Sequence, residues 1–164
     1  MKLLIIGHGR HGKDSVGDII AEDYGLRTVS SSMFAAEEVV RPYLQRVYGM
    51  SYATLDACYD DRHNHRGWWA EAIAAYNADD PTALTRGILA VSDVYVGLRS
   101  DREFFASRHL FDFVIGVVAF ERIPALDPTF LCPLGECDYL IDNNGPEEDL
   151  RPEVHRIMAR MANA

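Results

Sequence analysis

Residues 2–15 read KLLIIGHGRHGKDS and decide how the rest of the chain is interpreted. The apolar run at 3–6 predicts a buried strand, the glycines predict a tight loop, and Lys13 opens a predicted helix. The loop matches G-x-x-x-x-G-K, in which backbone N–H groups face a bound phosphate and the lysine reaches the β and γ phosphates. A plain glycine turn is the alternative, but a strand before and a helix after are the context that the phosphate motif requires. We therefore predict a phosphate-binding loop for ATP.

The residue after the lysine departs from the usual motif. Ser or Thr is common at that position, whereas this chain has Asp14 there and Ser15 one place later. Carboxylate and hydroxyl oxygens suit Mg²⁺, so both residues are predicted to serve the metal. Asp14 could hold Mg²⁺ directly or through water, or act as a base toward the acceptor. For Ser15 the alternative is a helix cap.

Strands and helices alternate along the rest of the sequence. This order predicts an α/β fold in three layers, with a parallel sheet of about five strands and helices on both faces. We expect one domain over residues 1–164, with a helical insertion at about 33–91 on the acceptor side. The predicted strands are 2–6, 27–30, 93–98, 112–119 and 137–141, and the predicted helices are about 13–24, 33–47, 69–77, 80–91, 101–108 and 146–162. Ligands of such folds bind at the carboxyl ends of the strands.

Composition narrows the function classes. The 164 residues carry a net charge of −9, which argues against a protein that coats nucleic acid non-specifically. No apolar run has the length of about 20 residues that spans a bilayer, so we expect no membrane partner and a cytoplasmic location. Cys58, Cys132 and Cys137 are an odd number, which favours reduced thiols. The oligomeric state is left open.

Several stretches resemble the P-loop kinases of bacteriophages, in particular the deoxynucleoside monophosphate kinase group. Gly-Lys-Asp followed by Ser, at 12–15, is similar to their phosphate loop. Residues 30–35 (SSSMFA) are similar to the serine and Phe-Ala that open their acceptor-side helix. An arginine follows the strand at 94–98, and DNNG at 142–145 resembles their last turn. The block at 61–80 looks like the short phage kinases, among which are kinases that phosphorylate 5-hydroxymethyluracil in DNA during thymine hypermodification.

The resemblance implies a nucleoside-kinase-like P-loop fold, ATP and Mg²⁺ as cofactors, and a deoxynucleotide as acceptor. The acceptor is narrowly favoured as the 5-hydroxymethyl group of 5-hydroxymethyluracil in DNA, and the alternative is a free deoxynucleoside monophosphate. A non-catalytic nucleotide-binding module is a further alternative, because the strand before Arg99 has no Asp of Walker B type. The residues predicted to bind ATP are Gly7, His8, Gly9, Arg10, His11, Gly12, Lys13, Asp14, Ser15 and Asn144.

Phosphoryl transfer depends on positioning and on cations around the transferred group, so arginines near strand ends are informative. Arg99 is predicted to contact phosphate and, with Lys13 and Asp14, to be catalytic; a salt bridge to Asp101 or Glu103 is the alternative. Arg41 stands where nucleotide kinases often bind the acceptor phosphate, although a solvated helix face explains it equally well. Ser31 and Arg102 complete this part of the predicted acceptor site.

Residues 60–69, DDRHNHRGWW, gather charge and both tryptophans of the chain. Aromatic faces stack on bases, and Arg62 and Arg66 stand four residues apart on one helix face, where they could grip a phosphate. We therefore predict that Arg62, Arg66 and Trp68 bind the acceptor. The alternative is that the tryptophans form the apolar face of an amphipathic helix. The pair His63 and His65 lacks a third ligand at metal-binding spacing.

Overall fold

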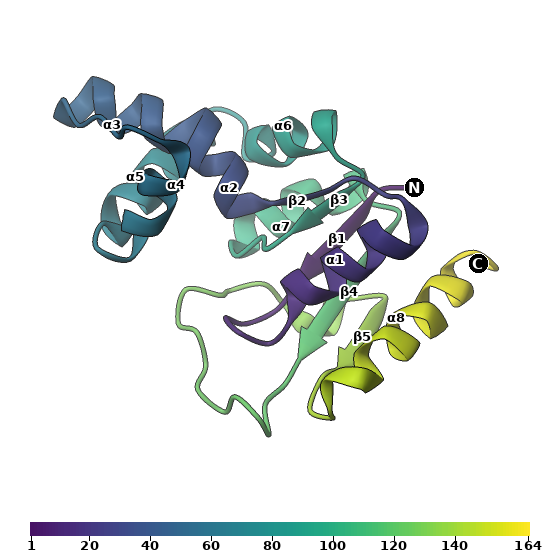
Figure 1. The fold of residues 1–164 in the computed structure, drawn as a ribbon. Helices are drawn as coiled ribbons and strands as arrows, with labels where there is room; N and C mark the ends of the chain where they lie inside the picture. The colour runs from purple at the N-terminus through teal and green to yellow at the C-terminus, as the bar shows by residue number, and fades with distance from the viewer.

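The computed structural model describes residues 1–164 and contains one parallel sheet of five strands in the order β2-β3-β1-β4-β5. This confirms the predicted α/β class. The N-terminal strand β1 lies in the middle of the sheet, between β3 and β4, as its wholly apolar sequence indicates (Figure 1). The strands are β1 (Leu3–Ile6), β2 (Thr28–Ser30), β3 (Val94–Val96), β4 (Phe113–Val118) and β5 (Tyr139–Asp142).

Helices cover both faces of the sheet, which gives the three layers. Helix α1 (Lys13–Tyr24) and helix α8 (Glu147–Met161) pack side by side on one face. The other face is covered by α2 (Ser31–Ala35), α6 (Ala83–Val91) and α7 (Asp101–Ser107), with short turns of 3-10 helix at Asp61–His63, Arg108–Leu110 and Leu134–Glu136. None of the helices combines the length and the apolar character that crossing a membrane requires.

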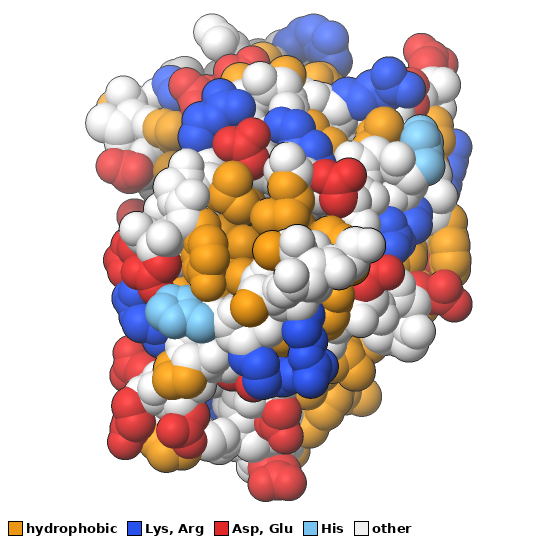
Figure 2. Space-filling view, turned by 90° about the vertical axis from the view of Figure 1, so that its right-hand side faces the viewer, with side chains coloured by type: hydrophobic (Ala, Val, Ile, Leu, Met, Phe, Trp, Pro, Cys, Tyr) orange, Lys and Arg blue, Asp and Glu red, His pale blue; other side chains and the backbone are white.

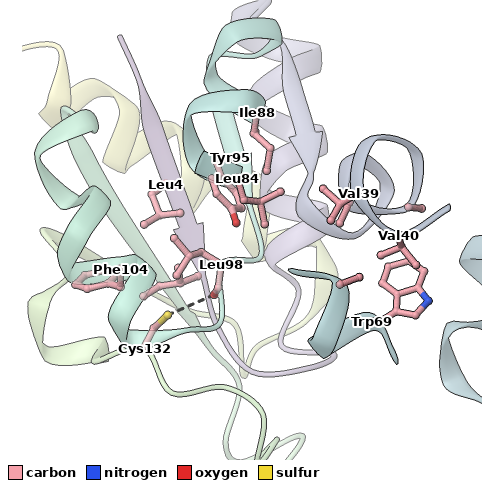
Figure 3. Close-up of a cluster of buried hydrophobic side chains, with 14 of the residues drawn as sticks. Leu4, Val39, Val40, Trp69, Leu84, Ile88, Tyr95, Leu98, Phe104 and Cys132 are labelled. Atoms are coloured by element: carbon pink, nitrogen blue, oxygen red, sulfur yellow. Dashed lines mark hydrogen bonds between the residues drawn. The ribbon is translucent and has the colours of Figure 1, made fainter. Parts of the chain in front are cut away.

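Alternate side chains of β1 enter two separate cores. Leu3 and Ile5 join the cluster under α1 and α8, whereas Leu4 and Ile6 join the larger cluster on the other face. This alternation follows from the strand period of two. Figure 3 shows part of the larger cluster, which runs from Phe104 in α7 to Trp69 in the helical insertion. The sheet is therefore held on both sides, and its carboxyl ends are fixed in position.

The segment between β2 and β3 forms the helical insertion, which projects away from α8 in Figure 1. One helix was expected at 33–47, but the chain forms α2, a π-helical turn at Ala36–Val40 and then α3 (Arg41–Tyr48). The three segments are contiguous, and Pro42 accounts for the π-helical turn before it, because it has no N–H to donate and its ring crowds the carbonyl of the preceding turn. Two further helices, α4 (Leu55–Asp60) and α5 (Arg66–Tyr76), complete the insertion with α6.

Candidate active site

The loop between β1 and α1 curls through backbone conformations that favour glycine. Gly12 has φ of 94°, and a Cβ atom there would meet Asn143 Nδ2 at 2.2 Å. A Cβ atom on Gly7 would meet the carbonyl oxygen of Val117 at 2.5 Å. Arg10 has φ of 64° and is the only residue other than glycine with a positive φ. Both motif glycines, Gly7 and Gly12, are thus required by close contacts.

The curled loop leaves donors free for a ligand. The N–H of His11 donates to the carbonyl of His8, but those of Gly9, Arg10 and Gly12 donate to no backbone carbonyl. The first N–H groups of α1 lie next to them, and a helix N-terminus carries a partial positive charge. The arrangement therefore presents unpaired N–H donors to an anion, as the motif predicts.

Charged and hydroxyl groups meet beside this loop. The side chain of Lys13 is 10% exposed, and its Nζ lies 3.4 Å from Asp14 Oδ2, which is open to solvent. Ser31 Oγ donates to the carbonyl of Gly97 at 3.1 Å, and a Cβ on Gly97 would lie 3.5 Å from Lys13 Cε. The carboxyl ends of β1, β2 and β3 therefore bring Lys13 and Ser31 together, as expected for a parallel sheet.

The side chains of His8 and His11 take a role that the sequence did not reveal. His11 Nδ1 accepts from the N–H of Ala119 at 3.1 Å, and its Nε2 lies 3.2 Å from the carbonyl oxygen of Ile123. These two bonds together require the neutral tautomer with the proton on Nε2. His8 Nδ1 accepts from the N–H of Asp127 at 3.1 Å. Both imidazoles thus hold residues 119–127 against the phosphate loop, and the N–H of His11 is also paired, so the predicted binding of ATP by His11 is not supported.

Arg99 pairs with a residue that the sequence analysis did not consider. Its Nη1 donates to Asp127 Oδ2 at 2.5 Å and to Thr129 Oγ1 at 2.8 Å. The expected alternative partners, Asp101 and Glu103, make no bond to it. Burial raises the pKa of Asp127, but hydrogen bonds from Thr129 and Arg99 outweigh burial and keep that pKa well below its ordinary value. The carboxylate is therefore ionised beside the loop.

Glu103 instead forms a buried polar cluster under α7. It is 5% exposed, and its Oε1 accepts from Thr85 Oγ1 at 2.8 Å and from the Tyr95 hydroxyl at 3.2 Å. Burial raises its pKa, against the opposing effect of the two hydrogen bonds. Because the cluster joins α6, β3 and α7, it fixes the helix that follows Arg99.

Asn143 and Asn144 connect the last strand to the loop. Asn143 Nδ2 donates to the carbonyl of His11 at 2.9 Å, which holds the loop from behind. Asn144 Oδ1 accepts from the N–H of Glu121 at 2.9 Å, and the Asn144 side chain also borders a polar cavity of about 330 Å³ between the end of β5 and α8. The Asn-Asn-Gly turn was noticed in the sequence, but nothing there indicated that Asn143 supports the loop.

The aromatic stretch of the insertion makes its contacts locally. The ring of Trp68 stacks on His65 at 4.2 Å and on Tyr48 at 4.7 Å between centroids. Arg62 donates to the carbonyl of Tyr59 and lies over the Tyr59 ring at 3.7 Å. Trp69 is buried in the larger core cluster. This is the position that the alternative of an amphipathic helix predicts for one of the two tryptophans. Trp68 and Arg62 thus have partners within the insertion, which leaves Arg66 as the exposed, unpaired cation of the stretch.

The other predicted acceptor residues have few partners. Arg41 begins α3 and is half-buried, and the side chain of Arg102 projects from the first turn of α7 into solvent. Neither guanidinium makes a hydrogen bond or an ion pair with the protein. Both are therefore free to meet a ligand, although no contact joins either to the phosphate loop.

The oxygen atoms next to Lys13 suit a magnesium ion. Asp14 offers a carboxylate that is 66% exposed beside Lys13, whereas the exposed hydroxyl of Ser15 borders the hollow between α1 and α8 with Asp18 and Glu22. Mg²⁺ is usually bound by one or two protein oxygens together with water and substrate phosphates, so the carboxylate of Asp14 alone is sufficient. Asp14 fits the metal that a nucleotide would bring, and no contact joins Ser15 to it.

Solved structures share this fold. A Thermus thermophilus protein has a TM-score of 0.56 over 98% of this chain and 97% of its own, at 14% identity. A gluconokinase from Sinorhizobium meliloti 1021 has a TM-score of 0.51 over 99% of this chain and 93% of its own, at 18% identity. At such identities the likeness shows the fold, which is the three-layer α/β fold of P-loop kinases. No protein-family model and no curated protein matches the sequence.

Proposed function

We propose that this protein is a P-loop kinase that transfers the γ-phosphoryl group of ATP to a deoxynucleotide. The observation that carries the proposal is the loop after β1, where the N–H groups of Gly9, Arg10 and Gly12 are unpaired next to Lys13. A buried ammonium group beside free N–H donors is the arrangement that binds the phosphates of a nucleotide. The shared fold is consistent with this chemistry and does not select it.

The chain's own residues have distinct roles in this proposal. The loop N–H groups and Lys13 bind the β and γ phosphates, and Arg99 neutralises charge on the transferred group. Asp14 would hold Mg²⁺, which when bound offsets phosphate charge. Asn144 borders the cavity next to α8. The volume of this cavity, about 330 Å³, is sufficient for a nucleobase. In the reaction the acceptor oxygen forms a bond to the γ-phosphorus, the bond to the β,γ-bridging oxygen breaks, and the acceptor hydroxyl gives up its proton.

For the acceptor, we favour the 5-hydroxymethyl group of 5-hydroxymethyluracil in DNA. Support comes from the resemblance to short phage kinases at 61–80, together with the similar motifs at 30–35 and 142–145. An enzyme that acts on a base must take it out of the stack, and we assign the helical insertion to the acceptor side. Arg66 and Arg41 in the insertion, and Arg102 in α7, are exposed or half-buried cations without a bonded protein partner that could contact DNA phosphates.

A free deoxynucleoside monophosphate is the second candidate acceptor, and two observations favour it. Both stacking contacts of Trp68 are with protein rings, so that residue offers less surface to an extruded base than the sequence suggested. The net charge is −9, and Figure 2 shows acidic and basic side chains interspersed on one face of the molecule. A protein without a broad basic surface gains little from the phosphates of a duplex.

One experiment separates these functions. The protein is incubated with γ-labelled ATP and, in parallel, 5-hydroxymethyluracil DNA, unmodified DNA and each of the four deoxynucleoside monophosphates. Label on modified DNA alone supports the first acceptor, and label on a free nucleotide alone supports the second. ATP binding without any acceptor-dependent transfer would instead identify a non-catalytic nucleotide-binding module.

Lys13 provides the matching test of the phosphate loop. Lys13→Ala removes the ammonium group from the phosphate site, and we expect transfer to fall by about 10³-fold or more, because a single charged donor at a transferred group is worth about that much. Arg160→Ala removes an exposed cation from the last turn of α8 and serves as the control. Wild-type turnover in the Lys13 variant would refute the assignment of the loop.

A further inference from the structure

We propose that Asp127, with Thr129, is a positioning residue that holds Arg99 beside the phosphate loop, so that residues 119–132 form a structural arm of the active site. The inference rests on the proposed function only for the role of Arg99 in phosphoryl transfer, and the placement of Arg99 by Asp127 does not depend on it. It adds a role for the segment after β4, in which the sequence showed no motif.

Asp127 is held from three directions. Thr129 donates to Asp127 Oδ1 through both its hydroxyl, at 2.6 Å, and its N–H, at 3.0 Å. The N–H of Asp127 donates to His8 in the phosphate loop at 3.1 Å. The other oxygen, Oδ2, lies 3.2 Å from where a Cβ on Gly9 would stand, and it accepts from Arg99. Asp127 therefore joins the phosphate loop, through its N–H, to the arginine after β3, through its carboxylate.

The arm itself is fastened at both ends. At the start, the N–H of Ala119 donates to His11, and Phe120 packs edge-on against the same imidazole, with ring centroids 5.0 Å apart. Near the end, the N–H of Leu131 donates to the carbonyl of Arg99 at 2.8 Å. Cys132 Sγ donates to the carbonyl of Leu98, the bond drawn as a dashed line in Figure 3. Asp127 is therefore placed by the fold as well as by its ion pair.

The way in which Arg99 is held leaves part of its guanidinium free. Both bonds, to Asp127 and to Thr129, use Nη1, and neither Nη2 nor Nε has a partner in the protein. The side chain is 41% exposed. Because a guanidinium is a rigid planar fork, fixing one end sets the direction of the remaining donors. Those donors have no protein partner and are available to a phosphoryl group.

A competing explanation is that Asp127 blocks the phosphate site, as a carboxylate standing where phosphate would bind. The hydrogen bonds do not favour this explanation. No N–H of the phosphate loop donates to Asp127, and the only bond between them runs from the N–H of Asp127 to His8. The carboxylate thus lies beside the N–H groups that would receive the phosphates, and leaves them unpaired.

The test compares Asp127→Asn, Arg99→Gln, the double variant and Glu136→Gln. The asparagine keeps an oxygen for Thr129 and places either a neutral oxygen or an N–H opposite Arg99. Glu136 is an exposed carboxylate near the arm whose side chain makes no bond, so its variant is the charge-matched control. For each protein we would measure kcat, KM for ATP, ATP affinity by calorimetry, and trypsin cleavage after Arg122, which lies within the arm.

We expect Asp127→Asn to lower kcat by about 10- to 100-fold, because a small misplacement of a catalytic group has effects of that size. ATP affinity should change by less than about threefold, and the control should behave as wild type. The double variant should lose no more than Arg99→Gln alone, since Asp127 acts through Arg99. Cleavage after Arg122 should speed up in Asp127→Asn, because the arm loses one of its attachments.

Three results would overturn the inference. Unchanged kcat in Asp127→Asn would show that Arg99 needs no partner, and tighter ATP binding with faster turnover would show that the carboxylate blocks the site. Losses that multiply in the double variant would show that Asp127 acts independently of Arg99. If the wild type transfers no phosphate at all, the proposed function fails. In that case, faster cleavage with unchanged ATP affinity in Asp127→Asn still supports its place in the arm, and unchanged cleavage removes that support.

Discussion

The phosphate loop and the helical insertion are held by contacts of opposite kinds. The loop is fixed by residues far along the chain, since Asn143 bonds His11 across 132 positions and Asp127 bonds His8 across 119. The polar and stacking contacts of residues 52–68 are local, since Asp61 accepts from Tyr52 nine positions away and Trp68 stacks on His65. The conformation of the loop therefore depends on polar contacts with distant parts of the chain, whereas the insertion is joined to the sheet by the apolar side chains of the larger core cluster.

This difference has a consequence for the two halves of a transfer reaction. On the proposed function, the loop that would bind ATP is positioned by the sheet, by β5 and by the segment after β4. The proposed acceptor side consists of helices that contact the sheet mainly through α2 and α6. Changes in the insertion should thus alter the acceptor or stability while ATP binding remains, and changes in the loop should alter both.

Asp14→Asn should give the largest effect on the loop side. The substitution keeps the shape of the side chain and removes the charge next to Lys13. If Asp14 serves Mg²⁺ or the acceptor proton, turnover should fall by about 10²–10⁴-fold with only a modest change in ATP affinity. Steady-state kinetics and calorimetry measure the two quantities. Asp14→Ser restores the conventional motif and shows whether the departure is needed; near-normal turnover in Asp14→Asn would remove this role from Asp14.

Gly12→Ala tests whether distant contacts really fix the loop. An alanine at this position would have to keep a positive φ, and its methyl group would meet Asn143 Nδ2. We therefore expect the free energy of unfolding to fall by about 2–5 kcal/mol and ATP binding to weaken. Gly25→Ala is the matched control, because φ there is 67° and nothing lies within 4 Å. It should cost only the conformational part, about 1–2 kcal/mol, and leave ATP binding unchanged. Equal losses in the two variants would contradict the contact with Asn143.

The comparison also explains how much of the molecule the sequence predicted. The sheet, the loop and α1 follow from short-range patterns: an apolar run, spaced glycines and Lys13 specify them locally, and α1 occupies the predicted residues. The roles of His8 and His11 could not be predicted, because their partners lie more than 100 positions away in a segment without a motif. Two histidines in the variable positions of a phosphate loop were the only local sign.

In the insertion, the sequence favoured a base-binding surface for a different reason. Arginines and tryptophans close together in sequence suggested a surface for a base, but the same residues satisfy one another: Arg62 lies over Tyr59, and Trp68 stacks on Tyr48. Composition alone cannot distinguish an aromatic side chain that is free to bind a ligand from one that already stacks on a neighbouring side chain. Arg99 shows the same limit, since its partner Asp127 belongs to a loop whose path no local pattern sets.

Trp68→Ala tests the insertion side and should have a smaller effect than Gly12→Ala. Removal of the ring abolishes two stacking contacts, each worth about 0.5–1.5 kcal/mol beyond burial, so the free energy of unfolding should fall by about 2 kcal/mol. Because both stacking partners of Trp68 belong to the insertion and not to the phosphate loop, ATP affinity should not change. Denaturant melts and calorimetry give the two values. Arg66→Ala, an exposed cation without a partner, should leave stability unchanged and weaken transfer only if the acceptor carries phosphates.

The smallest expected effect concerns His8, where the loop meets residues 119–132. Burial lowers the pKa of His8 below its ordinary value of 6.5, His11 and Arg99 lower it further, and Asp127 opposes them. Since the folded protein favours the neutral imidazole, the unfolded chain binds more protons between the lowered pKa and 6.5. Stability should therefore be complete above about pH 6.5 and should fall as the pH drops through that window. The asparagine of His8→Asn offers an oxygen to the N–H of Asp127 but cannot be protonated. The melting temperature of this variant should therefore change less with pH than that of the wild type over the same range. An NMR titration that placed the pKa of His8 at or above 6.5 would contradict this expectation, and with it the conclusion that the arm buries the imidazole.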